Sequence, residues 1–551
     1  MWLLMCSLTG PMACEDVFIY VESQFLMVSH RFRWVYCQLE TLRHCLPASV
    51  RRILAELPET LDATYERILQ EIPKSNQVHA HRLLQCLTVA VRPLRVEELA
   101  EILAVDFDTS EGIPKLNEAL RWEDQEQAVL SACSSLIAVI KDEDSRVVQF
   151  SHFSVKEFLT SDRLAMSKMD ASLYHHIPLE PAHTIMAQAC LGVLLRLDPH
   201  TDEGNTGDFP LAWYAVEHFG DHAEFENVLS HIWDGVDDLL DAEKSHFAVW
   251  FRIYRDRNWG DWTDEPPAVT PLYYVSRRGY RGLVDYLISK RPEDMNVRGY
   301  YGTPLHAALR EGHADVAQLL LRHCVEDVDI RGREDRTPLH LAAGHGLLGV
   351  TRTLVERNAD INSRDGSGDT PLHRTMDDWH SQFERTQDCR LDVVKFLLEH
   401  GADPDAKNDR HLTPLHAASY YGSLEGAQLM LEHGANIHAR SKTGQTPLHR
   451  VLDHLTDTSY ALDIFLDIVR CLLARGADVD ALDDDRGTPL HLASRDGCVT
   501  GARVLLEHGA NVHLEDKKGR TPFQVASEEG ETDITQLLSA FAESAKHVTL
   551  L

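Results

Sequence analysis

Thr303-Pro304-Leu305-His306 is the first intact copy of a four-residue motif that recurs through the second half of this chain. The intact copies begin at Thr303, Thr337, Thr370, Thr413, Thr446 and Thr488, and looser copies begin at Thr270 and Thr521. Counted from threonine to threonine, the steps are 33, 34, 33, 43, 33, 42 and 33 residues. A period in this range is typical of a solenoid. We therefore expect about eight stacked units over residues 266–545, with degenerate first and last units.

The motif itself predicts the start of a helix. Threonine is a good N-cap, and proline at the first helical position loses no hydrogen bond by lacking an N–H. Histidine can hydrogen-bond locally through a ring nitrogen, and the small pair Ala307-Ala308 lets a second helix pack closely. Glycines mark the turn between the two helices of a unit, at Gly312, Gly346, Gly422 and Gly497.

A second set of glycines marks the end of each second helix, where a left-handed residue without Cβ is favoured. These are Gly401, Gly434, Gly476 and Gly509. Asn358 takes this place in one unit and tolerates the conformation, whereas Cys324 takes it in another, where we expect a distorted helix end. In the two long units the extra residues should lie between the first and second helices, at Met376 to Asp388 and Asp453 to Ile464.

This pattern resembles the ankyrin repeat over roughly residues 266–540. The resemblance implies recognition of a protein partner on the concave surface, which hairpin tips and first helices form, and it implies no chemistry. Four residues there are not needed for the repeat fold and belong to types enriched in binding hot spots, so we predict them as partner-binding: Arg310, Tyr420, Tyr421 and Arg495. The alternative is that the two tyrosines only cover the next helix.

The first half resembles parts of fungal NACHT-type signalling NTPases. Residues 1–70, including the segments 32–43 and 57–69, are similar to the end of the nucleotide-binding module. Residues 71–165 are similar to the winged-helix module named after a GPI inositol-deacylase, a name that implies no catalysis here. The sequence fits that module with a predicted helix over 80–89, a break at Pro93, and a predicted wing hairpin formed by 136–140 and 147–150. Residues 166–265 are similar to the helical connector that follows.

The sequence lacks the phosphate-binding loop that a NACHT-type NTPase requires. No Gly-x-x-x-x-Gly-Lys-Ser/Thr occurs in these 551 residues, although that loop cradles the nucleotide phosphates. We expect either a protein that has lost its ATP-binding module or a gene model that begins late. The predicted fold is mainly α: an ankyrin solenoid in the C-terminal half, and a helical and winged-helix N-terminal half.

Charge and composition narrow the possible partners and cellular compartments. A net charge of −32 opposes binding to nucleic acid or to an anionic membrane. The 11 cysteines show no framework or Cys-x-x-Cys spacing, which favours a reducing compartment. The apolar residues at the N-terminus have no basic n-region and are too few for a signal peptide or a spanning helix. We therefore expect a cytoplasmic protein, with the nucleus as an alternative.

No catalytic, cofactor or metal site is predicted. The repeated histidines should stand about 10 Å apart, because they lie on successive packed helices, and this is too far to share one zinc ion. His218 and His222 have a metal-compatible spacing but no evident third ligand. A DNA-reading winged helix is disfavoured because Glu97, Glu98 and Glu101 crowd the candidate recognition helix.

The sequence thus favours a non-enzymatic scaffold that binds an unidentified protein partner. The alternative is a NACHT-type signalling NTPase whose ATP-binding part is missing from this chain.

Overall fold

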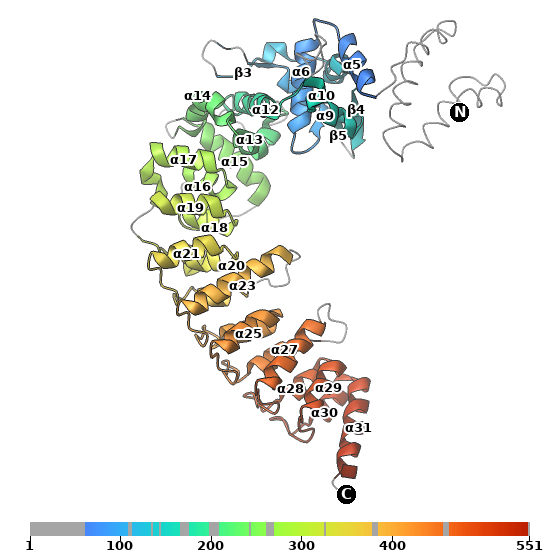
Figure 1. Ribbon diagram of the computed structural model, residues 1–551, viewed down its shortest axis with the longest axis vertical. Helices are drawn as coiled ribbons and strands as arrows, with labels where there is room; N and C mark the ends of the chain where they lie inside the picture. The colour runs from blue at the N-terminus through green and yellow to red at the C-terminus, as the bar shows by residue number, and fades with distance from the viewer. Residues whose placement is uncertain are drawn as a thin grey trace, which may run out of the picture. The chain divides into compact units, whose positions relative to one another are not determined.

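The structure is a computed structural model that describes residues 61–107, 109, 113–133, 136–142, 145–165, 176–197, 209–241, 244–259, 269–323, 327–376, 384–453, 455 and 462–548. The chain forms two compact units, residues 1–263 and 264–551. Both are built mainly from helices, as predicted (Figure 1). Of the segment that resembles the NACHT module, only α5 (Leu61–Glu71) is described, and Cys324 also lies outside the described residues.

The first unit continues from α5 with short strands and helices. Its helices are α6 (Gln77–Val89), α7 (Val96–Ile102), η2 (Glu118–Leu120), α8 (Gln125–Cys133), α9 (Phe153–Leu159), α10 (Asp162–Ala165), α12 (Leu179–Leu194), α13 (Ala212–Ala223), α14 (Val228–Leu240) and α15 (His246–Trp259). Its strands are β1 (Leu94–Arg95), β2 (Val105–Asp106), β3 (Lys115–Leu116), β4 (Ile137–Asp142) and β5 (Ser145–Phe150).

The predicted wing is present as the antiparallel hairpin β4–β5. Val139 pairs with Val148, and Val148 pairs on its other side with Leu94, so the sheet order is β1-β5-β4. Val148 and Leu94 are fully buried. The hairpin therefore joins the core of the winged helix through the central strand.

The acidic residues of α7 do not form the exposed acidic face that the sequence suggested. Glu98 is fully buried, and its carboxylate accepts hydrogen bonds from Arg92 at 2.8 and 2.9 Å and from Arg95 at 3.0 Å. Glu101 is buried as well and pairs with Arg121. Burial alone would raise the pKa of Glu98, but the bonds and charge of Arg92 lower it overall. Both buried carboxylates are therefore paired with arginines, and removal of one partner would leave an uncompensated buried charge.

A buried polar chain links the winged helix to the connector helices. The hydroxyl of Tyr214 on α13 accepts from the backbone N–H of Val91 at 3.0 Å and lies 2.8 Å from Nε2 of His222. Nδ1 of His222 lies 2.9 Å from Nδ1 of His183 on α12. Burial first, and then the charge of His183, lowers the pKa of His222 to about 3, so this ring stays neutral at ordinary pH.

The second unit is a stack of helix pairs in sequence order (Figure 1). The first helices are α16 (Pro271–Arg278), α18 (Pro304–Arg310), α20 (Pro338–Gly344), α22 (Pro371–Arg374), α24 (Pro414–Tyr421), α26 (Pro447–Leu452), α28 (Pro489–Arg495) and α30 (Pro522–Glu529). The second helices are α17 (Arg281–Lys290), α19 (Ala314–His323), α21 (Leu348–Glu356), α23 (Glu384–Glu399), α25 (Leu424–Glu432), α27 (Leu462–Ala474), α29 (Val499–Glu507) and α31 (Thr532–Val548). Short 3-10 turns, η4 (Pro292–Asn296) and η5 (Arg333–Asp335), lie between units.

Each predicted first helix begins with proline directly after its threonine. The predicted helix-end glycines have positive φ, for example +94° at Gly401 and Gly476, and Asn358 has φ +64°. In the two long units, the extra residues lie between first and second helix as predicted, because α22 ends at Arg374 before α23 begins at Glu384, and α26 ends at Leu452 before α27 begins at Leu462. Part of each insertion extends the second helix.

Candidate protein-interaction surface

The motif histidines connect successive repeats. In all six intact motifs the threonine N–H donates to Nδ1 of the histidine three residues later, at 3.1 to 3.3 Å. The opposite ring nitrogen, Nε2, donates to the carbonyl of the residue just before the next threonine, at 2.9 to 3.2 Å. The sequence predicted only a local bond, so this second contact is new. Each histidine therefore caps its own helix and also binds the following repeat.

This geometry fixes the protonation state of the rings. Nδ1 accepts a hydrogen bond and Nε2 donates one, which requires the neutral ring. Burial lowers the pKa of His306, His340 and His416 to about 4 in each case. Protonation of Nδ1 would break the helix cap. The histidines thus have a structural role, as the sequence indicated.

Three of the four predicted binding residues lie in the stretch formed by α24, α26 and α28. Tyr420 and Tyr421, at the end of α24, meet edge to face with ring centroids 5.1 Å apart. Tyr420 is 37% exposed, and the guanidinium carbon of Arg450 on α26 lies 4.3 Å from its ring centroid. Arg450 in turn donates to Asp453 at 2.8 Å. Aromatic and arginine side chains are thereby held together at the ends of neighbouring first helices.

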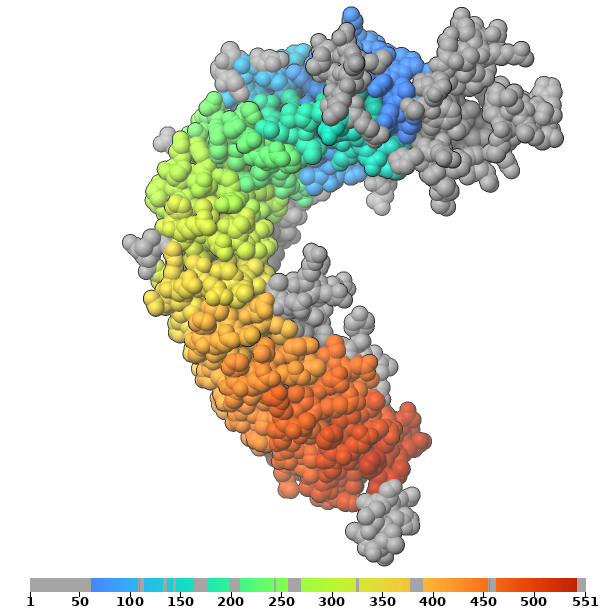
Figure 2. Space-filling model, viewed as in Figure 1, coloured from blue at the N-terminus to red at the C-terminus, as the bar shows by residue number. Residues whose placement is uncertain are grey.

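Arg495 extends this cluster to α28. Its guanidinium binds Asp496 at 2.7 Å and Asp453 at 3.3 Å. The hydrogen bond to Asp496, followed by the nearby acidic charges, raises the pKa of Arg495. Asp453 therefore bridges two arginines from successive repeats. We call Tyr420, Tyr421, Arg450, Asp453 and Arg495 the interaction surface. The space-filling view shows the repeats of the second unit following one another in sequence order (Figure 2).

Arg310 does not belong to this cluster. It lies at the end of α18, three repeats before α24, and its guanidinium carbon is 4.9 Å from the ring centroid of Tyr301. Arg277 lies over the same ring at 5.4 Å and also pairs with Glu311 at 3.0 Å. The array thus carries a second arginine–tyrosine group, separate from the interaction surface.

Arg450 and Asp453 were missed by sequence reasoning, although one signal was available. In both long repeats an arginine follows the motif histidine, at Arg374 and Arg450, where other repeats have a small or apolar residue. Arg374 binds the buried carboxylate of Asp365 at 2.5 and 2.8 Å. Burial alone would raise the pKa of Asp365, but the bonds of Arg374 lower it. A large cation at this position indicates an acidic partner nearby.

No metal site emerges from the described part of the chain: it contains no group of three or more His, Cys, Asp or Glu side chains suited to hold an ion. His222 is bound to Tyr214 and His183, and His218 contacts Asp221 at 3.0 Å. Among the same residues, no helix combines the length and apolar character that crossing a membrane requires.

Two protein-family models match parts of this chain. A model described as ankyrin repeats matches residues 256–332, 272–365, 385–458 and 459–548. A model described as the GPI inositol-deacylase winged helix domain matches residues 65–169. The chain therefore contains ankyrin repeats and a winged helix domain of this type.

Curated relatives share segments of this chain. Azaphilone pigments biosynthesis cluster protein L of Monascus ruber is 29% identical over 265 residues, which are 44% of this chain and 53% of that protein. Alpha-latrocrustotoxin-Lt1a of Latrodectus tredecimguttatus is 37% identical over 82 residues, 15% of this chain and 5% of the toxin. Human inversin is 29% identical over 168 residues, 30% of this chain and 14% of inversin. The chain thus spans about half the length of the first relative and much less of the others.

Proposed function

We propose that this chain is a non-enzymatic recognition scaffold of the cytoplasm or nucleus, whose ankyrin array binds a partner protein. In this proposal residues 71–165 are the winged helix, 166–265 the connector and 266–545 the array. Ankyrin repeats support protein–protein interaction and are not catalytic. The partner is a protein rather than nucleic acid or membrane, because a net charge of −32 repels both polyanions.

The observation that carries the proposal is the continuous chain Tyr420–Arg450–Asp453–Arg495 across three repeats. Tyr and Arg are enriched in binding hot spots. Here the arginines are already held by Asp453, which reduces the side-chain entropy lost when a partner binds. The ring of Tyr420 is 37% exposed beside Arg450, so part of it is available for contact with a partner.

Affinity capture from a cell lysate tests this proposal. The full chain is compared with a variant that carries both Tyr420→Ala and Arg450→Ala, with captured proteins identified by mass spectrometry. We expect at least one protein to be enriched on the parent chain and depleted on the variant, while both chains remain folded at the temperature of the capture, as checked by thermal melting. Identical sets of captured proteins would remove the interaction surface from consideration.

The alternative function is that of a NACHT-type signalling NTPase, which the winged helix domain favours. Such an activity requires a phosphate-binding loop that these residues do not contain. Under our proposal, isothermal titration of the full chain with Mg-ATP gives no binding heat and no turnover. Micromolar ATP binding with hydrolysis would favour the alternative.

A further inference from the structure

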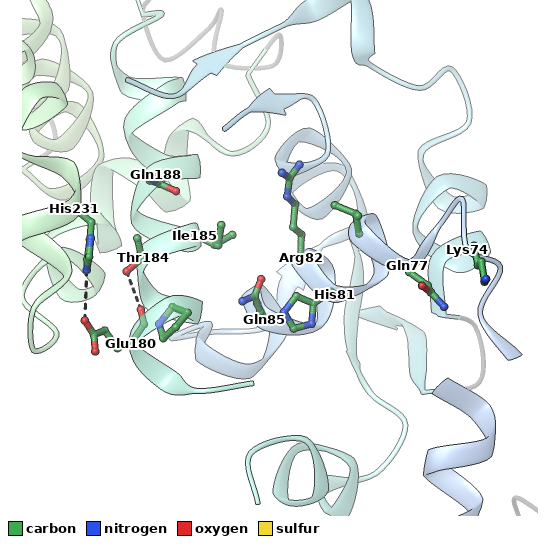
Figure 3. A pocket seen from close by; sticks show the side chains of 12 residues that line it. Lys74, Gln77, His81, Arg82, Gln85, Glu180, Thr184, Ile185, Gln188 and His231 are labelled. Carbon is green, nitrogen blue, oxygen red and sulfur yellow. Dashed lines mark hydrogen bonds and ion pairs between the residues drawn. The ribbon is translucent and has the colours of Figure 1, made fainter. Parts of the chain in front are cut away.

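The first unit contains a groove of about 650 Å³ between α6 and α12, with His231 of α14 at one edge (Figure 3). From α6 it is lined by Gln77, Val78, His81, Arg82 and Gln85, and from α12 by Glu180, Pro181, Thr184, Ile185 and Gln188. This volume is within the usual range of ligand sites. The groove shares no residue with the interaction surface, which belongs to the second unit.

Two glutamine amides line the groove without intramolecular partners. Gln85 is only 5% exposed, yet among the described residues neither Gln85 nor Gln188 makes a hydrogen bond. Gln188 is half-buried, and the amide atoms of both residues reach solvent at the groove, so they are open to hydrogen bonds from a ligand. Each amide offers one carbonyl acceptor and two N–H donors, the same groups that a peptide backbone offers. The pair is thus suited to bind peptide groups from two sides (Figure 3).

The charge of the groove is opposite to that of the chain. Lys74 and Arg82 line it, and its one carboxylate, Glu180, already contacts His231 at 3.5 Å. Lys74 has no ion-pair partner within the described ranges, and it is exposed. Lys74 and Arg82 give the groove a local positive charge, which favours an acidic ligand at this place although the net charge of the chain is −32.

Apolar contacts complete the site. Val78 is 58% exposed at the groove, and Pro181 and Ile185 line the opposite helix. The lining face of α6 runs from Gln77 to Gln85, about 12 Å at 1.5 Å per residue. This distance equals about four residues of extended peptide at 3.3 Å per residue.

We propose that the groove between α6 and α12 binds an acidic segment of a partner protein in extended form. The backbone of an extended segment leaves N–H and C=O groups available for Gln85 and Gln188, whereas a helix satisfies its own. Acidic side chains on one face meet Lys74 and Arg82, and apolar side chains on the other face meet Val78 and Ile185. The alternation of acidic and apolar residues is the feature that this site recognises.

Fluorescence anisotropy of the full chain tests the proposal, with two labelled ten-residue peptides as probes. In the first peptide Glu alternates with Val, and in the second the uncharged Gln alternates with Val. We expect saturable binding of the Glu peptide only, with an affinity that falls at least tenfold when salt rises from about 50 to about 300 mM. Absence of saturable Glu-peptide binding, or equal binding of the Gln peptide, would overturn the proposal.

Two groove variants and one matched control make the test specific. Lys74→Glu should weaken Glu-peptide binding at least tenfold, whereas Lys141→Glu, the same charge change on the exposed strand β4, should stay within twofold. Gln85→Met should weaken binding at least fivefold while the melting temperature changes little, because the amide makes no hydrogen bond within the described residues. Equal effects of Lys74→Glu and Lys141→Glu, or a melting temperature that falls with Gln85→Met, would contradict the assignment.

Two further outcomes are decisive. Tyr420→Ala with Arg450→Ala should leave peptide affinity unchanged, so this proposal and the proposed function can fail separately. Light scattering should show a monomer at all concentrations. A dimer that Lys74→Glu dissociates would assign the groove to a second copy of the chain and overturn the partner-peptide proposal.

Discussion

Arg450 covers the ring of Tyr420 at 4.3 Å and binds Asp453 at 2.8 Å, so one side chain joins two neighbouring repeats. Cation–π contacts and charge-assisted bonds of this kind hold a guanidinium in one orientation. The interaction surface is therefore ordered before any partner arrives.

The tyrosine pair tests whether that surface binds. Tyr420→Ala together with Tyr421→Ala should weaken capture of the partner by about 2 kcal/mol or more, the hot-spot scale. Quantitative pull-down and thermal melting measure the two effects. The melting temperature should move little, whereas the paired control Thr413→Gly with Pro414→Gly should lower it, since it removes a helix cap and a preset first-turn dihedral. If both pairs cost the same stability, the tyrosines belong to the core.

The motif histidines predict an acid-sensitive array. Burial lowers the pKa of all six in the folded state, to about 4 at His306, His340 and His416, against about 6.5 in unfolded chains. Unfolding therefore takes up protons, and stability present above pH 6.5 is lost as the pH falls toward 4. Each histidine contributes a slope of up to about 1.4 kcal/mol per pH unit in this window. Urea unfolding at several pH values measures how the free energy of unfolding changes with pH.

A variant isolates one histidine. Gln524 occupies the motif position in the last repeat and accepts from the N–H of Thr521 at 2.8 Å, so glutamine is compatible with the cap. His416→Gln should lower stability at pH 7, because the bond from Nε2 to Gln445 is lost, and it should also reduce the pH slope. An unchanged slope would mean that His416 does not titrate as its surroundings require.

The buried chain in the first unit gives a second stability prediction. Tyr214→Phe removes the acceptor of the Val91 N–H and a hydrogen-bond partner of His222. Leaving buried polar groups unpaired should cost about 1 to 3 kcal/mol of unfolding free energy. Tyr420→Phe is the matched control, because that ring is exposed and surface changes usually stay within about 0.5 kcal/mol. Equal costs for the two substitutions would refute a structural role of the Tyr214 hydroxyl.

The long repeats should tolerate shortening. Helix α26 ends at Leu452 and α27 begins at Leu462, and the two helices pack together. Replacement of residues 456–461 by one glycine should therefore leave a single cooperative unfolding transition, as followed by circular dichroism. A broadened or split transition would show that these residues are needed for the stack.

The repeat architecture was predictable because its determinants are local. Thr303 and Pro304 set a helix start through the cap and a fixed φ, and Gly401 or Gly476 sets a helix end through positive φ. Each of these preferences acts within a few residues. Repetition at a constant spacing then made the stacking evident, and the hairpin around residues 136–150 followed from its β-rich runs.

The contacts between repeats were not predictable in the same way. Nε2 of His416 binds a backbone carbonyl 29 residues away, and a carbonyl has no side-chain signature in a sequence. Arg450 and Tyr420 meet only because α24 and α26 are neighbours in space. Glu98 and Glu101 looked like an acidic surface because their arginine partners are recognised only once the fold places them.

The two-sided histidine also bears on how such a gene changes length. The ring donates to the residue that precedes the next threonine, so a segment cut from one threonine to the next contains both partners of one such contact, for example His306 and Arg336. Duplication or loss of such a segment restores every such contact without a new substitution. Gln524 takes the place of the histidine in the unit that begins at Thr521, and its amide oxygen accepts the cap hydrogen bond. It has no imidazole ring and therefore lacks the Nε2 donor of the motif histidines. Internal units carrying the intact motif can thus be duplicated or lost while the contacts between repeats are kept.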